Sequence, residues 1–151
     1  MFKFFFFPFT AIWSLFMHFR RGFYDNGRRV KYEKPTICVG NLCMGGSGKT
    51  PHTEYLIRLL SQNQNNVAVL SRGYGRKTKG LRFVDSTSGS KDVGDEPLLM
   101  YKKHTPIPVV VSKNRIEGLD TIFTKFPQTD VVILDDAYQY MSLKQIGRAH
   151  V

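Results

Sequence analysis

The sequence lacks features on which several classes of protein depend. Its 151 residues include only two cysteines, Cys38 and Cys43, which excludes the disulfide framework of small secreted modules. No small-x-small cleavage site follows the apolar N-terminal run, so a removable signal peptide is not indicated. The sequence also lacks a G-x-G-x-x-G dinucleotide fingerprint and any internal repeat. These absences, together with the length, favour one ordinary globular domain.

Acidic residues are also scarce. There are 12 Asp and Glu against 22 Lys and Arg, which gives a net charge of +10 and a pI near 9.8. Such an excess predicts an anionic partner: a nucleotide, a nucleic acid or an acidic membrane surface. The nucleic-acid interpretation rests on charge alone, because no motif of interleaved aromatic and basic residues supports it. We therefore expect no nucleic-acid partner.

The N-terminal segment from Phe4 to Phe19 is almost wholly apolar, but it is shorter than the roughly 20 residues needed to span a bilayer. From Phe9 onward, a helical pattern separates a narrow polar ridge from an apolar side. We predict that residues 1–34 form an amphipathic, basic segment whose helix lies in the interface of an anionic membrane. Packing of this helix on the core of its own domain is the alternative. The ridge consists of Thr10, Ser14, His18 and Arg21.

The most informative stretch is Thr36–Pro51, in which an apolar run leads into three glycines, a Lys-Thr pair and a helix-like segment. This is the context of a phosphate-binding loop, whose backbone N–H groups surround a phosphate at the start of a helix. Lys49 would supply a charge for the terminal phosphates, and the Thr50 hydroxyl would bind Mg²⁺. The first glycine of the strict pattern is replaced by Cys43. The predicted cradle comprises Gly45, Gly46, Ser47, Gly48, Lys49 and Thr50.

A second element is the apolar run Val131–Leu134, which ends in the carboxylates of Asp135 and Asp136. An unbroken apolar run is typical of a parallel strand that is buried on both faces. Alone, such a run is more often just a strand that enters a polar turn. Because the carboxyl end of this strand would lie beside the phosphate loop, we predict that Asp135 and Asp136 join Thr50 in a Mg²⁺ site.

Strand-like and helix-like segments alternate along the rest of the chain. We expect strands at 36–41, 67–71, 109–112 and 131–134, and helices at 51–64, 97–104 and 117–126. This alternation predicts an α/β fold with a parallel, P-loop NTPase-like sheet and helices on both faces. The long loop at 73–94, which is rich in Lys, Arg and Gly, is predicted to be functional or disordered. The first helix is expected to bury Tyr55, Leu56, Leu59 and Leu60.

Asp95 and Glu96 precede Pro97 at the expected start of a helix. Acidic residues at such a place cap the helix and complement its dipole, and without other information this interpretation is favoured. The functional alternative makes Asp95 a general base that takes a proton from a hydroxyl attacking ATP.

Five blocks of the sequence together resemble one family, the lipid A 4′-kinases (tetraacyldisaccharide 4′-kinases) of Gram-negative bacteria. Their order and spacing cover almost the whole chain up to Lys144, and jointly they are far more specific than a generic phosphate loop. The family also lacks the first glycine of the strict loop pattern, so Cys43 is consistent with it. The blocks are Phe23–Gly27, Val39–Pro51, Leu70–Arg76, Val93–Pro97 and Asp135–Gln139.

The resemblance implies transfer of the γ-phosphate of ATP, with Mg²⁺, to the 4′-hydroxyl of a tetraacylated disaccharide 1-phosphate. The reaction would take place at the cytoplasmic face of the bacterial inner membrane. Lys49 and Asp95 would be catalytic, which replaces the capping-only interpretation of Asp95. Thr50, Asp135 and Asp136 would hold the metal. The residues Arg72, Tyr74 and Arg76 match a block near the active site and are assigned to the lipid substrate.

The sequence departs from the family at Ala137, where many members have Gly, and at Tyr140, where His is usual. Members of the family are also longer, and a histidine thought to pair with the catalytic aspartate belongs to the half that is absent here, so we assign no catalytic histidine. We expect residues 35–145 to be an incomplete P-loop kinase domain that is inactive alone. Residues 146–151 match the translation of a common sequencing adapter and are expected to be a non-native tail.

A protein of another class remains the alternative. Membrane-associated P-loop ATPase switches share the Gly-Gly-x-Gly-Lys-Thr loop and a membrane-binding helix. Their loop carries a signature lysine just before its first glycine, and Met44 occupies that position here. This residue argues against the switch.

Overall fold

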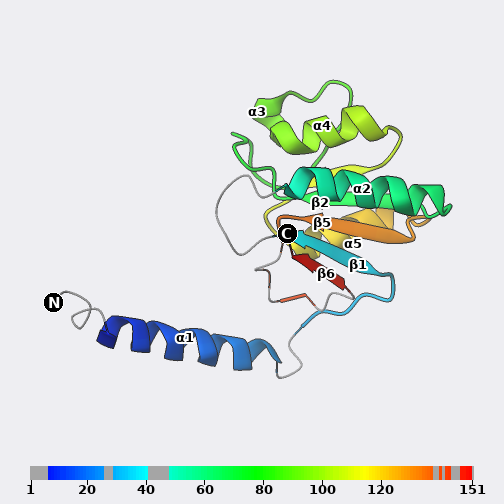
Figure 1. Cartoon of the computed structure of the whole chain (residues 1–151). Helices are drawn as coiled ribbons and strands as arrows, with labels where there is room; N and C mark the ends of the chain where they lie inside the picture. The colour runs from blue at the N-terminus through cyan, green and yellow to red at the C-terminus, as the bar shows by residue number, and fades with distance from the viewer. Residues whose placement is uncertain are drawn as a thin grey trace. The chain divides into compact units, whose positions relative to one another are not determined.

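The computed structural model of the chain describes residues 7–25, 29–40, 48–137, 140, 142–143 and 147–150. It divides into two compact units. The helical unit contains residues 1–31 and 141–144, and the sheet unit contains residues 32–140 and 145–151. Both units are shown in Figure 1.

The helical unit is dominated by one long helix, α1 (Phe7–Asp25). The predicted N-terminal helix is therefore confirmed, and it begins two residues before Phe9, because a proline such as Pro8 is tolerated in a first helical turn. Its large apolar side chains are exposed, with Trp13 at 64% and Phe19 at 79%. No helix in the described ranges is both long enough and apolar enough to cross a membrane. The unit also contains a parallel bridge between Val30 and Leu143.

The sheet unit is built on one six-stranded sheet with the order β3-β4-β2-β5-β1-β6. All neighbouring strands are parallel except β3, which is antiparallel to β4. The four predicted strands are confirmed, whereas β3 and β6 were not predicted. β3 has only two residues, inside the long loop predicted at 73–94, too few for any alternation to be visible. The bounds are β1 Thr36–Gly40, β2 Val67–Ser71, β3 Arg82–Phe83, β4 Val109–Val111, β5 Val131–Asp135 and β6 Gly147–His150.

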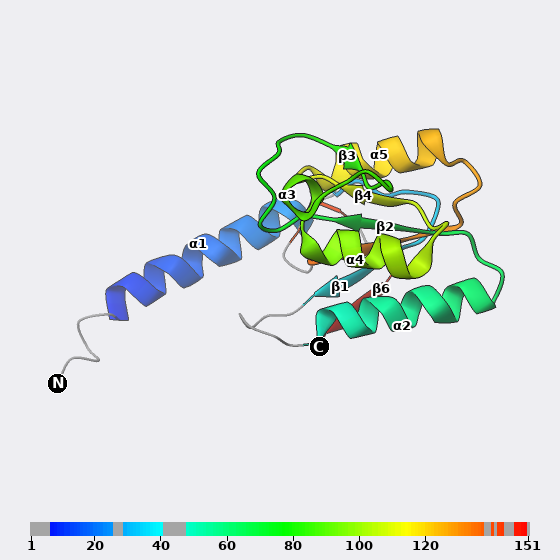
Figure 2. The ribbon, with the colours of Figure 1, turned by 90° about the horizontal axis from the view of Figure 1, so that it is seen from above.

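Helices cover both faces of this sheet, as predicted (Figures 1 and 2). Each of the three predicted helices begins two residues before its expected position, and the short helix α3 was not predicted. For α5 the cause is a side-chain cap, because the Asn114 amide oxygen accepts hydrogen bonds from the N–H groups of Ile116 and Glu117. The helices are α2 Lys49–Gln62, α3 Ser90–Val93, α4 Asp95–His104 and α5 Arg115–Lys125.

The core lies on both sides of the strands, which explains their unbroken apolar sequences. On one side, Val69 and Ile133 pack with Ile57 of α2 and Met100 of α4. On the other side α5 approaches β2 so closely that a Cβ on Gly118 would lie 2.6 Å from Cδ1 of Leu70. A larger residue at position 118 would require the Leu70 side chain to move.

The predicted buried face of α2 was partly wrong. Tyr55 is 57% exposed and Leu59 is 39% exposed, whereas Thr53 and Ile57 are buried. Leu56 and Leu60 pack against the core as expected. The buried face includes the polar Thr53 because its hydroxyl contacts Asp135, and a search for apolar periodicity alone could not find it.

Candidate active site at the carboxyl ends of the strands

Most of the predicted site residues meet at one edge of the sheet. β1, β2 and β5 are parallel, with Val39 paired to Asp135 and Leu70 paired to Leu134, so their carboxyl ends share an edge. Arg72 follows β2 directly, and α2 starts after the loop that leaves β1. This edge is where ligands bind in open parallel sheets.

The predicted phosphate loop lies only partly within the described residues. Gly45, Gly46 and Ser47 lie outside them. Gly48 precedes α2 with a φ of 75°, a left-handed conformation that glycine adopts without steric cost. Lys49 and Thr50 are the first two residues of α2, where backbone N–H groups lack helical partners and favour an anion.

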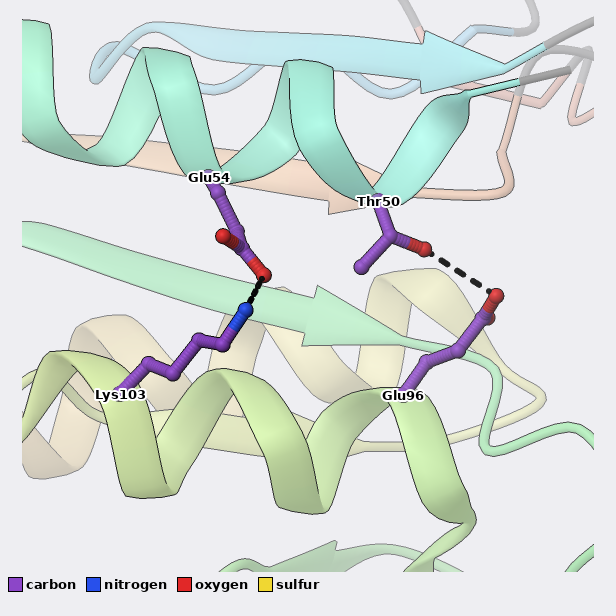
Figure 3. Close-up of polar contacts among 4 residues, drawn as sticks. All are labelled: Thr50, Glu54, Glu96 and Lys103. Carbon is purple, nitrogen blue, oxygen red and sulfur yellow. Dashed lines mark hydrogen bonds and ion pairs between the residues drawn. The ribbon is translucent and has the colours of Figure 1, made fainter.

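Two polar contacts join α2 to α4 (Figure 3). At the beginning of both helices the Thr50 hydroxyl donates a hydrogen bond to Oε1 of Glu96 at 3.2 Å. One turn further along α2, Glu54 forms an ion pair with Lys103 at 2.8 Å. These contacts place the first turn of α4 opposite the first turn of α2. Glu96 therefore belongs to the candidate site, although the sequence predicted it only as part of a helix start. Its position beside Asp95 was the one sequence signal that could have indicated this.

Asp135 is the most deeply buried carboxylate of this edge, with 1% of its surface exposed. The Thr53 and Ser71 hydroxyls donate long hydrogen bonds to its two oxygens, at 3.5 and 3.3 Å. Burial, and then the nearby charge of Glu96, raise the pKa of Asp135 to about 6, while the Ser71 hydrogen bond opposes the shift. Asp136 is exposed and lies in the left-handed region with a φ of 51°.

The raised pKa of Asp135 leads to a prediction for Asp135→Asn. The folded-state pKa of about 6 lies above the roughly 3.9 of an unfolded aspartate, so folding favours the protonated form. The free energy of unfolding should therefore fall as pH rises from about 4 to about 6 and stay low above that range. Because asparagine is neutral throughout, we expect the variant to be about 2–3 kcal/mol more stable than the wild type at pH 7.5.

Urea unfolding at several pH values checks this expectation. The advantage of Asp135→Asn should shrink below pH 6 and disappear near pH 4. Asp136→Asn is the matched control and should change stability little, because the Asp136 side chain is exposed. An Asp135→Asn variant that is less stable than the wild type at pH 7.5 would show that the carboxylate is stabilised, not strained, by its surroundings.

Arg115 supports the end of β5 and was not singled out from the sequence. Its side chain is buried, and its guanidinium donates to the carbonyl oxygens of Ser112 at 2.9 Å and Asp135 at 2.8 Å. A longer hydrogen bond, at 3.3 Å, reaches the carbonyl of Asp136. Burial lowers the pKa of Arg115, and the charges of Asp135 and Asp136 oppose that shift. A buried guanidinium needs such partners, and nothing in the local sequence pattern identifies them.

Asp95 is exposed and is the first residue of α4. The N-cap is Gly94, and no side chain caps the helix. The capping role expected for Asp95 was therefore wrong, although Asp95 and Glu96 both lie in the first turn, where they complement the helix dipole. Asp95 is thus available for another task.

Two glycines hold the Arg72–Arg76 block against the start of α4. A Cβ on Gly94 would lie 2.8 Å from the carbonyl oxygen of Tyr74, and a Cβ on Gly73 would lie 2.8 Å from that of Val93. The structure therefore brings the predicted substrate block close to Asp95. Arg72 and Tyr74 are exposed, and Arg76 is half-buried and donates to the carbonyl of Gly80 at 2.7 Å.

This close approach predicts that Gly94→Ala destabilises the chain. Gly94 has a φ of 97° and a ψ of 157°, a conformation that costs other residues about 1–3 kcal/mol, and the contact with the Tyr74 carbonyl adds to that cost. Gly80→Ala is the matched control, because Gly80 has a φ of 73° with open space around it. We expect a clearly larger loss of unfolding free energy for Gly94→Ala; equal losses would show that the contact is unimportant.

The oxygen atoms at this edge suit a hard divalent cation. Within the described ranges there is no group of three or more His, Cys, Asp or Glu residues arranged to hold a metal ion. Mg²⁺ bound together with phosphates, however, needs only one or two carboxylates besides water. Thr50, Glu96 and Asp135 provide a hydroxyl and two carboxylates, and the charge of Glu96 acts on Asp135. The residues present therefore fit a nucleotide-bound Mg²⁺.

Comparisons with known proteins agree on one family. The family model described as tetraacyldisaccharide-1-P 4′-kinase matches residues 2–146. The tetraacyldisaccharide 4′-kinase of Parabacteroides distasonis is 45% identical over 137 residues, covering 88% of this chain and 37% of that protein. That of Flavobacterium johnsoniae is 41% identical over 140 residues, covering 91% and 41%. The chain thus spans about two fifths of the length of these relatives.

A solved structure is similar over nearly the whole chain. It is a crystal structure of LpxK from Aquifex aeolicus, described as the "apo" form in complex with ATP. The similarity has a TM-score of 0.83 at 36% sequence identity and covers 99% of this chain and 49% of that one.

Proposed function

We propose that the full-length protein transfers the γ-phosphate of ATP to the 4′-hydroxyl of a tetraacyldisaccharide 1-phosphate, a step of lipid A biosynthesis. The chain belongs to the tetraacyldisaccharide-1-P 4′-kinase family. The observation that carries this proposal is the family match over residues 2–146, which contains every predicted site residue. The similar structure that holds ATP supports the choice of nucleotide. The alternative, an ATPase switch, is favoured by no observation beyond the shared loop and the N-terminal helix.

The nucleotide would bind where α2 begins. Gly45, Gly46, Ser47 and Gly48 would surround the phosphates with backbone N–H groups, and the start of α2 would add its positive end. Lys49 would place its ammonium group against the β- and γ-phosphates and balance the charge that moves during transfer.

Thr50, Asp135 and Asp136 are our proposed Mg²⁺ site, and we add Glu96 because its carboxylate already contacts the Thr50 hydroxyl. Bound Mg²⁺ would neutralise part of the phosphate charge. The buried Asp135 would then be held ionised, since a cation next to a desolvated carboxylate favours its charged form.

Asp95 would accept the proton of the attacking 4′-hydroxyl as a general base. Its exposure at the first turn of α4 leaves it open to an acceptor. The neighbouring block, held in place by Gly73 and Gly94, would contact the disaccharide lipid through Arg72, Tyr74 and Arg76. Uniting donor and acceptor in one geometry supplies much of the rate of such a transfer.

We also propose that residues 35–145 form the kinase domain of this chain and that residues 146–151 are not native to it. The family match includes only the first residue of that tail. The pairing of Gly147–His150 with β1 does not argue against the proposal, because an unpaired strand edge accepts almost any extended backbone. Resequencing of the source DNA beyond the codon for Gln145 tests it.

Residues 1–34 are proposed to bind the anionic surface of the bacterial inner membrane from the cytoplasmic side. The exposed apolar side chains of α1, such as Ile12 and Phe16, suit the boundary between headgroups and acyl chains. We expect deletion of residues 1–19 to reduce cosedimentation with anionic liposomes strongly, and we expect high salt to weaken the basic contribution that remains. Equal binding with and without the segment would assign α1 to protein packing instead.

The nucleotide half of the proposal is tested on the 151-residue chain. ATP with Mg²⁺ should raise its melting temperature, since a ligand that binds only the folded state stabilises it. AMP should have a much smaller effect, because it lacks the phosphates that Lys49 contacts. Equal shifts with ATP and AMP would contradict the proposed phosphate site.

A further inference from the structure

The positive charge of the sheet unit is concentrated in one segment. Residues 72–92, here named the basic loop, contain six Lys and Arg and two Asp, a net charge of +4. Residues 32–140 as a whole contain 14 basic and 11 acidic residues, a net charge of only +3. The rest of the sheet unit is therefore close to neutral. The six basic residues are Arg72, Arg76, Lys77, Lys79, Arg82 and Lys91.

Five of these six charged side chains are exposed, and one is half-buried. The half-buried residue is Arg76. Among the residues that the structure describes, none of the five exposed side chains forms an ion pair with a carboxylate. Arg76 alone has a structural role, the hydrogen bond that closes the turn to Gly80. The loop itself is ordered by backbone contacts, including the hydrogen bond from the N–H of Lys77 to the carbonyl of Lys91 at 2.8 Å.

An aromatic side chain stands at one end of the basic loop. Tyr74 is 84% exposed, and it lies between Gly73 and Gly75, whose φ angles are 68° and 77°. The two glycines allow a tight turn that presents the ring to solvent. Tyrosine rings are enriched at the headgroup level of membranes because one end is apolar and the other polar.

The basic loop leaves the sheet at the edge that carries the candidate site. It begins directly after β2 and ends at α3, just before Asp95. In Figures 1 and 2 this green segment lies at the same end of the sheet unit as the starts of α2 and α4. A lipid acceptor that stays in a membrane must reach this edge, so the edge has to face the bilayer.

We propose that the basic loop is a second membrane contact, which binds the headgroups of anionic lipids and orients the strand ends toward the bilayer. This inference rests on the proposed function in one respect, namely that the acceptor is a lipid held in a membrane. It is separate from α1, which belongs to the helical unit. Clustered Lys and Arg gain binding energy near an anionic surface from every charge, and Tyr74 adds an interfacial anchor.

A matched pair of double variants tests the charge. Lys79→Gln/Arg82→Gln removes two exposed charges of the basic loop, and Arg58→Gln/Lys102→Gln removes the same two residue types from exposed positions of α2 and α4. Vesicles contain phosphatidylcholine with or without phosphatidylglycerol, and neither ATP nor the disaccharide lipid is added. We expect the loop variant to bind anionic vesicles roughly tenfold more weakly than the control variant, with no difference on neutral vesicles.

The position of the loop is tested by fluorescence. Trp13 is the only tryptophan of the chain, so Trp13→Phe/Tyr74→Trp places a single reporter on the loop. Trp13→Phe/Tyr55→Trp is the control, because Tyr55 is also exposed, on α2. With anionic vesicles, emission should shift to the blue and be quenched by brominated lipids for the Tyr74 position but not for the Tyr55 position.

The proposal is overturned if both reporters respond alike, or if the two charge variants bind anionic vesicles equally. Loss of affinity for RNA but not for vesicles in the loop variant would also overturn it, in favour of a nucleic-acid surface. Because no nucleotide or acceptor is present, these results do not depend on whether the protein is a kinase.

Discussion

Replacing Lys49 with alanine in the full-length protein should lower turnover at least 10²- to 10³-fold, the usual loss when one preorganised charge partner of a transition state is removed. The ammonium group is proposed to follow the γ-phosphate as charge moves during transfer. Turnover is measured as phosphate transfer from labelled ATP to the disaccharide lipid in mixed micelles.

Lys102→Ala is the control for this variant, because Lys102 is an exposed lysine of α4 outside the site. It should retain turnover close to that of the wild type. Binding of ATP by Lys49→Ala should weaken less than turnover does, since backbone groups of the loop still contact the phosphates. Near-normal turnover of Lys49→Ala would remove Lys49 from the catalytic machinery.

Asp95→Asn should lower turnover about 10²- to 10⁴-fold, the range for loss of a general base, while ATP binding remains largely intact. Asparagine preserves the shape of the side chain and removes its charge from the first turn of α4, which should cost no more than about 1 kcal/mol of stability. Turnover and urea unfolding are measured on the same preparations.

The two measurements separate catalysis from helix stabilisation. The structure already assigns the N-cap to Gly94 and shows no side-chain cap, so we expect the rate and not the stability to change. A variant with a normal rate and a lower melting temperature would assign Asp95 to the helix dipole alone.

The fold was largely predictable because its signals are local. The strands around Val69 and Ile133 are buried on both faces, so their sequences are unbroken apolar runs between polar turns. Because these strand-like runs alternate with helix-like segments along the chain, a parallel sheet covered by helices is expected. The short strand β3 and the helix α3 carry no such signal, since two and four residues are too few to define a period.

The candidate site was predictable where its residues belong to a continuous motif. Lys49 and Thr50 follow a glycine-rich turn, and Asp135 ends an apolar strand, so local chemistry indicated both. Glu96 was missed as a partner of Thr50 because their contact joins two helices that are 46 residues apart in sequence.

Arg115 was missed for a related reason. Its guanidinium donates hydrogen bonds to the backbone carbonyls of Asp135 and Asp136 at the end of β5. A backbone carbonyl accepts such a bond whatever its side chain, so the contact leaves no trace in the sequence. The buried face of α2 was misplaced for the same reason. Thr53 lies on that face and Tyr55 does not, because the Thr53 hydroxyl contacts the carboxylate of Asp135, which is distant in sequence. Contacts between remote polar groups are determined by tertiary packing.

The activity that we propose for the full-length protein is transfer of the γ-phosphate of ATP to a specific hydroxyl of a lipid. The most direct measurement incubates full-length protein with γ-³²P-labelled ATP, Mg²⁺ and tetraacyldisaccharide 1-phosphate to detect labelled lipid, and locates the added phosphate in a parallel unlabelled reaction by mass spectrometry and ³¹P NMR. We predict a doubly phosphorylated lipid with the label on the 4′ oxygen, and no such product with Asp95→Asn. ATP hydrolysis to free phosphate, with the lipid unchanged, would contradict the proposed kinase activity and favour an ATPase switch.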